Sequence, residues 1–265
     1  MSGIRRCKFA FSWGEYKGKS CELKAGKSGF CDWHSAKKSV EEISSEFLLK
    51  RIGEKRSLEG FNLDGGMLPK IFLKNAMMPK VSFRDARLID ADMEGSILVE
   101  ANFRKANLRG INLDCTNLEN ANFEHASCQE ASFRNANLIS VRFGKANLEE
   151  ANLEGANLES ADLEEVNLEN ADLENAVMAY ANLCYAKMAG ACLENASLAY
   201  ANLEGANLEN ANLEGADLEG ANLEGANLQG ASLEGANLVD VKMDRANLKD
   251  ANLEDTSLED DDIDL

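Results

Sequence analysis

Residues 201–230 read ANLEGANLENANLEGADLEGANLEGANLQG. The same five-residue phrase continues in both directions without a change of register, from about Arg56 to Leu265, and makes 42 pentads. The third residue of the pentad is apolar in all 42 cases and is leucine in 30 of them. A unit of five residues cannot bury a hydrophobic face alone, so each pentad must stack on further copies of itself.

The pentad predicts a short strand followed by a corner. Its first residue is alanine in 29 of 42 cases, so small and large apolar residues alternate and face inward together. A five-residue period would spread the leucines around an α-helix, which excludes that structure. The fifth residue is glycine or asparagine in 19 pentads, which favours a turn with positive φ. We expect the corners that carry Lys105, Glu150 or Tyr180 to use a different turn.

The number of sides follows from residues that recur every fourth pentad. Phe83, Phe103, Phe123 and Phe143 are central residues spaced by 20. Four pentads per turn would place them in one internal column. With coils about 4.8 Å apart, about ten turns would make a rod about 50 Å long. We expect its backbone groups to pair with the coils above and below rather than within a pentad.

The repeats resemble the pentapeptide-repeat family, whose pattern is A(D/N)LXX, over residues 56–265. This resemblance implies an all-β solenoid, a right-handed quadrilateral β-helix of about ten coils over residues 58–265. Cys128 is the one central cysteine, and as a small hydrophobe it fits the core of such a helix.

Charge is distributed unevenly along the chain, whose net charge is minus 18. Residues 1–57 carry 13 bases and 7 acids, residues 58–145 carry 11 of each, and residues 146–265 carry 4 bases and 28 acids. We find no apolar run suited to a signal peptide or a membrane span. Together with seven irregularly spaced cysteines, this predicts a cytoplasmic protein that does not associate with membranes.

Four residues near the N-terminus have the side chains of a structural zinc site. Cys7, Cys21, Cys31 and His34 form the pattern Cys-x13-Cys-x9-Cys-x2-His in a small module over residues 1–35. Three thiolates and an imidazole complete a tetrahedral set and leave no open position for catalysis. The alternative is ordinary cysteines and a surface histidine. The segment resembles, more loosely than the repeats, Cys3His modules that precede pentapeptide repeats in other sequences.

Residues 36–57 are predicted to form a capping helix and linker. Ser39-Val40-Glu41-Glu42 has the form of a capping box, and the apolar stripe that follows, which includes Phe47 and Leu48, extends to about Ile52. A helix here would cover the first coil and prevent edge-to-edge association.

The sequence favours a binding or scaffold protein over an enzyme. It contains no Ser/His/Asp order and no phosphate-binding loop, and its carboxylates follow the repeat. His125 falls at an outward corner, where we expect only a surface residue. The partner of such a scaffold is not identified by these residues.

An acidic ladder is predicted along one face of the rod. Its members are spaced by 20 and are Glu154, Glu174, Glu194, Glu214, Glu234 and Glu254. The family resemblance implies one candidate role, because some members imitate DNA and protect type II topoisomerases such as gyrase. The alternative is that glutamate is a solvated default copied with each duplicated pentad.

Tyrosines interrupt the acidic surface between residues 176 and 200. Tyr180, Tyr185 and Tyr200 appear here, while alanine or cysteine replaces the usual glutamate. Tyr180 and Tyr200 should stack, being 20 residues apart. They form either a patch for a partner or a homodimer, or an aromatic ladder that stiffens the coil.

Nucleic acid is a third candidate partner, through the basic N-terminal module. The rod itself would repel nucleic acid because of its acidic field.

Overall fold

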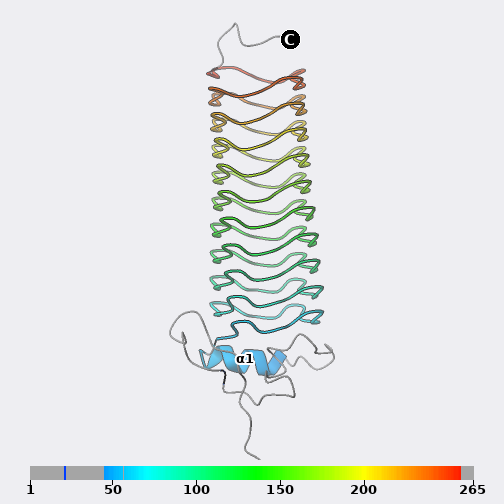
Figure 1. Ribbon diagram of the computed structural model, residues 1–265, viewed down its shortest axis with the longest axis vertical. Coiled ribbons are helices and arrows are strands. Elements are labelled where there is room, and N and C mark those ends of the chain that lie inside the picture. Colours follow the sequence, from blue (N-terminus) through cyan, green and yellow to red (C-terminus); the bar gives the residue numbers. More distant parts are fainter. Residues whose placement is uncertain (1–20, 22–44, 56, 258–265) are drawn as a thin grey trace, which may run out of the picture.

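The computed structural model describes residues 21, 45–55 and 57–257. Residues 57–257 wind into a tall stack of similar coils, and the helix α1, Ser45–Gly53, lies beneath the first coil (Figure 1). In this part of the chain no strand is longer than a single bridge residue, so each pentad contributes one β-bridge position. The repeat region is therefore a solenoid, as the pentad pattern predicts.

The coil has four sides. Every bridge is parallel and joins residues 20 positions apart, from Asn62 with Ser82 to Ser232 with Asn252. Twenty residues are four pentads, so the prediction from the phenylalanine spacing is confirmed. Each bridge residue is the second of its pentad and lies between the two inward-facing positions.

The interior is filled by the first and third residues of each pentad. Central side chains from Leu58 to Leu238 are at most 3% exposed, and the alanines that precede them are buried as well. The four phenylalanines stack in one column, with ring centroids 4.7 to 5.2 Å apart. Phe133 meets two of these rings edge-on from the opposite face. The side chains thus form one continuous core along the rod.

In a pentad with asparagine at the second position all five N–H groups can find acceptors, as the pentad 151–155 illustrates. Asn152 donates to the coil before, and Leu153 and Gly155 donate to the coil after, at N···O distances of 2.6 to 2.9 Å. The N–H of Ala151 instead closes the corner onto Leu148 O at 3.0 Å. The N–H of Glu154 binds the side-chain Oδ1 of Asn152 at 2.9 Å. The expectation of purely inter-coil pairing was therefore too simple, because two of the five donors bind locally.

All corners share one backbone conformation. The fifth residue of every pentad from Gly60 to Asp255 has φ between 53° and 67°. Lys105, Glu150 and Tyr180 have φ of 60°, 57° and 61°, so the expectation of a different turn at these corners was wrong. No corner in this range carries a β-branched residue, the class for which a left-handed φ is most unfavourable. The strain at each corner is offset by hydrogen bonds to the next coil and across the turn.

Helix α1 closes the N-terminal end of the core. Leu48 is fully buried within the same hydrophobic cluster as the coils, and Ile52 packs against it. The guanidinium of Arg51 donates to Ser57 O at 3.0 Å and lies 5.3 Å from the centre of the Phe61 ring. A helix at this end agrees with the sequence, whereas the predicted capping box at Ser39 lies outside the described residues. None of the described helices is long and apolar enough to cross a membrane.

Candidate functional site

The six glutamates of the predicted ladder lie in one column. Each is the fourth residue of a pentad on the same face, and the bridges between residues 152, 172, 192, 212, 232 and 252 set their pentads in register. Their carbonyl groups also bind the preceding coil, as in the 2.9 Å bond from Asn175 N to Glu194 O. The side chains are half-buried or exposed. The structure therefore assembles the ladder geometrically, and its role stays a prediction.

Countercharges accompany the acids only in the first part of the rod. Eight salt bridges are present among the described residues, and the base of each lies between Lys74 and Lys145. Most of them join residues 20 apart, such as Arg134 with Asp114 at 3.1 Å and Lys145 with Glu165 at 3.2 Å. Beyond Glu165, the described carboxylates form no salt bridge. The acidic surface of the later coils is thus not neutralised by the rod.

Asparagine at the second pentad position has a structural role that the sequence reasoning missed. Its Oδ1 accepts the N–H of the residue two positions later, as in the Glu124–Asn122 bond of 2.8 Å. Its Nδ2 can donate to the asparagine of the preceding coil, as in the 2.9 Å bond from Asn227 to Asn207. Aspartate replaces it because a carboxylate accepts the same local bond. The alternation of Asn and Asp at one position was the available signal.

The tyrosines lie flat against the following coil. Tyr180 and Tyr200 stack with ring centroids 5.4 Å apart and planes 10° apart, as predicted. A Cβ added at Gly220 would lie 2.6 Å from the Tyr200 ring, and one at Gly205 would lie 2.6 Å from the Tyr185 ring. Each ring therefore uses the space above a glycine, and Tyr185 occupies a different corner from the stacked pair.

The hydroxyl of Tyr200 donates to Glu219 Oε1 at 2.6 Å. This hydrogen bond, with the negative charge of the carboxylate, raises the pKa of Tyr200. The three tyrosines remain 49% to 60% exposed, so their packing leaves them open to a partner. The structure thus accommodates both earlier interpretations, a stiffening ladder and an exposed patch.

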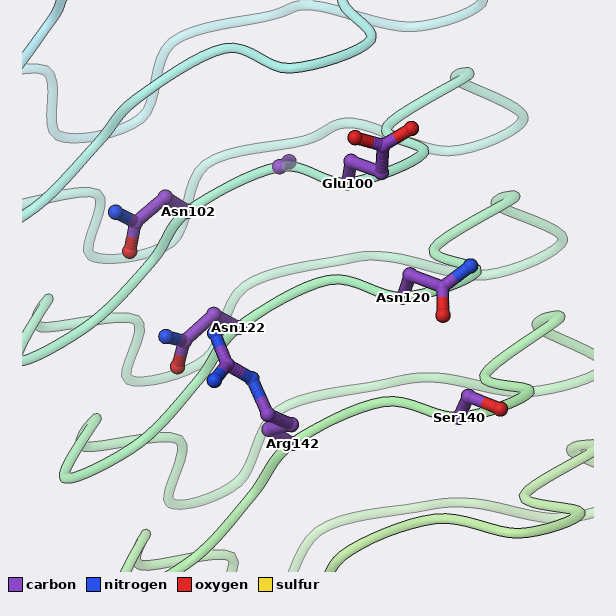
Figure 2. Close-up of a pocket in the computed structure, with 7 residues that line it drawn as sticks. Glu100, Asn102, Asn120, Asn122, Ser140 and Arg142 are labelled. Carbon is purple, nitrogen blue, oxygen red and sulfur yellow. The ribbon is translucent and has the colours of Figure 1, made fainter.

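A shallow polar groove lies at the corner between two faces (Figure 2). Its volume is about 490 Å³. The side chains come from two columns of successive coils: Glu100, Asn120 and Ser140 at the corner, and Asn102, Asn122 and Arg142 beside it. The groove offers amides, one carboxylate and one guanidinium, a set suited to hydrogen bonding with an extended polar ligand. Nothing in the sequence pattern indicated it.

The described cysteines and histidine form no reactive cluster. Within the described ranges, no three side chains of His, Cys, Asp or Glu gather as a metal site would require. Cys128 is buried in the core, as predicted, and burial raises the pKa of its thiol. Cys184 accepts a bond from Asn202 Nδ2 at 2.8 Å. His125 is exposed at a corner, as expected.

The proposed zinc ligands fall largely beyond the described residues. Cys7, Cys31 and His34 lie outside them, and Cys21 is described as buried, with 1% of its surface exposed. A buried thiol suits a closed structural site, but the tetrahedral set is not placed. Zinc binding and nucleic-acid binding by the basic N-terminal segment therefore both stay predictions.

Solved structures similar to this chain include pentapeptide repeat proteins and a fluoroquinolone resistance protein. One is HetL, a pentapeptide repeat protein involved in heterocyst differentiation regulation from the cyanobacterium Nostoc. It is 34% identical in sequence, the match covers 84% of this chain and 100% of HetL, and the TM-score is 0.48. Rfr23 from the cyanobacterium Cyanothece is 41% identical over 43% of this chain and 64% of its own, with a TM-score of 0.13. Full-length QnrB1, a plasmid-mediated fluoroquinolone resistance protein, is 16% identical, covers 66% and 92%, and has a TM-score of 0.26.

No curated protein matches the chain by sequence. The family model described as pentapeptide repeats matches in overlapping copies over residues 80–114, 101–138, 116–155, 142–179, 156–195, 186–225 and 221–260. These matches cover more than half of the chain. The chain belongs to the pentapeptide-repeat family.

Proposed function

We propose that this protein is a non-enzymatic scaffold whose acidic coils bind another protein. The observation that supports this function is the column of glutamates on coils that form no salt bridge beyond Glu165 among the described residues. Like charges about 4.8 Å apart repel one another, so the column is not there to stabilise the fold. Such a field attracts a basic surface and accelerates its encounter with the rod. As part of this proposal, the rod that carries the glutamate column is a right-handed β-helix of about ten coils.

The scaffold function is tested by capture of partners from native lysate with purified full-length protein. One variant carries Glu174→Gln, Glu194→Gln and Glu214→Gln in the ladder. A matched control carries Asp90→Asn, Glu94→Gln and Glu130→Gln, which removes the same total charge from earlier coils. We expect the ladder variant to lose a partner that the control retains. Equal retention or equal loss by both variants would contradict the proposal.

A second candidate is DNA mimicry directed at a type II topoisomerase such as gyrase. Residues 146–257 carry 23 acids and 4 bases, a net charge of minus 19. At 20 residues per coil and about 4.8 Å per coil, they span about 27 Å, which gives about 0.7 negative charges per Å. Duplex DNA carries about 0.6 per Å. This agreement in linear charge density favours the candidate.

Direct binding to purified gyrase and a changed rate of DNA supercoiling would support the mimicry. The ladder variant should lose both effects, and the control variant should keep them. If gyrase activity is the same with and without the protein at micromolar concentration, mimicry of this enzyme's substrate is wrong, while the scaffold function stands on its own test.

We also propose that Cys7, Cys21, Cys31 and His34 hold one structural zinc ion. A closed set of three thiolates and an imidazole would fold a segment too small for a core of its own. Metal analysis should give one zinc per chain, and Cys31→Ser should abolish it. A Cys31→Ser protein that retains stoichiometric zinc would refute this ligand set.

A further inference from the structure

The polar groove and the stacked tyrosines lie on the same edge of the rod. The corner residues of one column are, in order, Glu100, Asn120, Ser140, Ser160, Tyr180 and Tyr200, which we call the tyrosine edge. Backbone bonds join successive members through the coils, such as the 3.0 Å bond from Tyr180 N to Ala199 O. The groove occupies the first three positions and the tyrosines the last two. One ligand could therefore contact both features.

The groove end offers directional hydrogen bonds. The Oδ1 of Asn102 and that of Asn122 accept local backbone N–H groups at 3.1 and 2.8 Å. Their amide nitrogens donate to no other described residue, and in Figure 2 these side chains lie on the opposite side of the groove from Asn120 and Ser140. An extended chain advances about 3.3 Å per residue and the coils are about 4.8 Å apart, so its carbonyl groups meet these donors at intervals rather than at every coil.

The tyrosine end offers an aromatic ring next to carboxylates. Tyr200 covers one face of the Tyr180 ring, and the preceding coil places only the small, exposed Ser160 at this corner. The Tyr180 side chain is 60% exposed, which agrees with an open ring face. Glu159, which is exposed, precedes Ser160 at this corner, and Glu219 accepts the Tyr200 hydroxyl at the same corner two coils after Tyr180. An open ring face next to the carboxylate of the preceding coil attracts a guanidinium or ammonium group by cation–π and ionic contacts.

Apolar residues separate the tyrosines from the acidic ladder. Val177, Ala179 and Ala199 lie on the face that ends at the tyrosine edge, and Val177 is 37% exposed. These side chains supply contact area, and they add no positive charge that would compete with a ligand's guanidinium or ammonium group for the carboxylates. Among the described residues of coils 156–200, Lys187 is the one base, and it lies on a different face.

We propose that the tyrosine edge binds an extended polypeptide segment of a partner protein, with an arginine or lysine of that segment against Tyr180. This inference rests on the proposed scaffold function and names its binding site and partner chemistry. From Glu100 to Tyr200 there are five coil steps, about 24 Å, which an extended segment of about seven residues spans. A second copy of the chain does not fit, because its own tyrosine edge would bring the same carboxylates against Glu159 and Glu219.

The test uses full-length protein and a fluorescein-labelled peptide of about eight residues that alternates serine and arginine. Fluorescence anisotropy is measured at about 150 mM NaCl, where distant charges are screened. Wild-type protein should bind this peptide and should not bind the same peptide with citrulline in place of arginine. Absence of saturable binding to the arginine peptide, or equal binding of both peptides, overturns the proposal.

Three variants locate the site. Tyr180→Ser should weaken binding about fivefold or more, while Tyr180→Phe, which keeps the ring, should stay within about twofold of wild type. Tyr185→Ser is the matched control, because Tyr185 is 57% exposed but lies at another corner, and it should also stay within about twofold. If Tyr185→Ser weakens binding as much as Tyr180→Ser, the edge has no special role and the proposal is wrong.

The groove end is tested by Ser140→Tyr, which fills the groove with a residue type that other corners already carry. We expect it to weaken the peptide about fivefold, with an unchanged melting temperature. Unchanged binding would restrict the site to the tyrosines and would overturn the proposal that one extended segment also contacts the groove. A partner captured through the glutamate ladder but indifferent to Tyr180→Ser would leave the scaffold function standing and this inference refuted.

Discussion

The first half of the rod, residues 57–145, and the second half, residues 146–257, share one backbone but differ in surface chemistry. Both repeat every 20 residues, bury their central residues and use positive φ at every corner. The first half has 11 bases for 11 acids and places its charges in opposite-sign pairs across coils. The second half has 4 bases for 23 acids. The repeat therefore determines the fold, and the outward residues are free to serve binding.

The largest effect should come from charging the shared core. Leu213→Arg in the second half and Leu113→Arg in the first should each destabilise by about 5 kcal/mol or more, because a buried unpaired charge adds to the lost apolar contact. Thermal unfolding followed by circular dichroism measures the loss. Glu214→Arg, the next residue but outward, is the control and should melt near wild type. A Leu213→Arg protein with wild-type melting would contradict the inward placement.

The phenylalanine column should make the core of the first half more sensitive to truncation. Phe123→Ala removes a ring that contacts Phe103, Phe133 and Phe143 and should cost about 3 to 5 kcal/mol. Leu203→Ala, on the same face of the second half, should cost about 1 kcal/mol less because no aromatic pairs are lost. Denaturant unfolding compares the two. An equal or larger loss for Leu203→Ala would contradict the greater sensitivity of the phenylalanine column.

Within the second half, two corner glycines should respond differently to the same change. Gly225→Ala meets no atom within 4 Å and should cost only the strain of a left-handed alanine, about 1 kcal/mol. Gly220→Ala should cost more, since its Cβ would lie 2.6 Å from the Tyr200 ring and displace it from Glu219. Melting temperature and the near-ultraviolet tyrosine signal measure both effects. Identical behaviour would mean that the ring moves freely.

The smallest effect should distinguish the two surfaces by its sign. Arg134 and Glu194 occupy the same outward column, in the first and second halves. Arg134→Glu breaks the pair with Asp114 and should lower the melting temperature. Glu194→Arg places a positive charge between two glutamates of the ladder, which removes their repulsion with Glu194, and should raise the melting temperature. Both shifts should shrink in about 0.5 M NaCl because salt screens exposed charges. Shifts of the same sign would contradict the contrast between the halves.

The sequence was sufficient for the architecture because the core obeys a strict period. Leucine at the third position predicted burial, and Phe83 and Phe103 predicted four sides, since only a 20-residue coil stacks them. The turn at Lys105 was misjudged from intrinsic residue preference, whereas every corner adopts a single φ, and up to Gly235 the corner N–H also bonds to the next coil. Periodicity thus carried information that single-residue preference did not.

The candidate site was only partly predictable. The Tyr180–Tyr200 stack followed from spacing, since both residues fall on one corner. The groove at Asn120 and Arg142 could not be read from the pattern, because it depends on side-chain volumes at two adjoining columns. The hydrogen-bonding role of Asn122 was likewise hidden, since a solvated asparagine and one that completes a turn look alike in sequence.

Parallel bridges at a fixed separation of 20 residues also limit how such a chain can change in length. Loss or gain of one pentad would preserve every inward leucine, yet it would turn all later faces by a quarter of a revolution. The glutamates after residue 154 would then no longer align with those before the change, and Tyr180 would leave the edge that Glu100 begins. Only a whole coil can be added or removed without rotating the surface, so the binding faces, rather than the core, set the unit by which this molecule can lengthen.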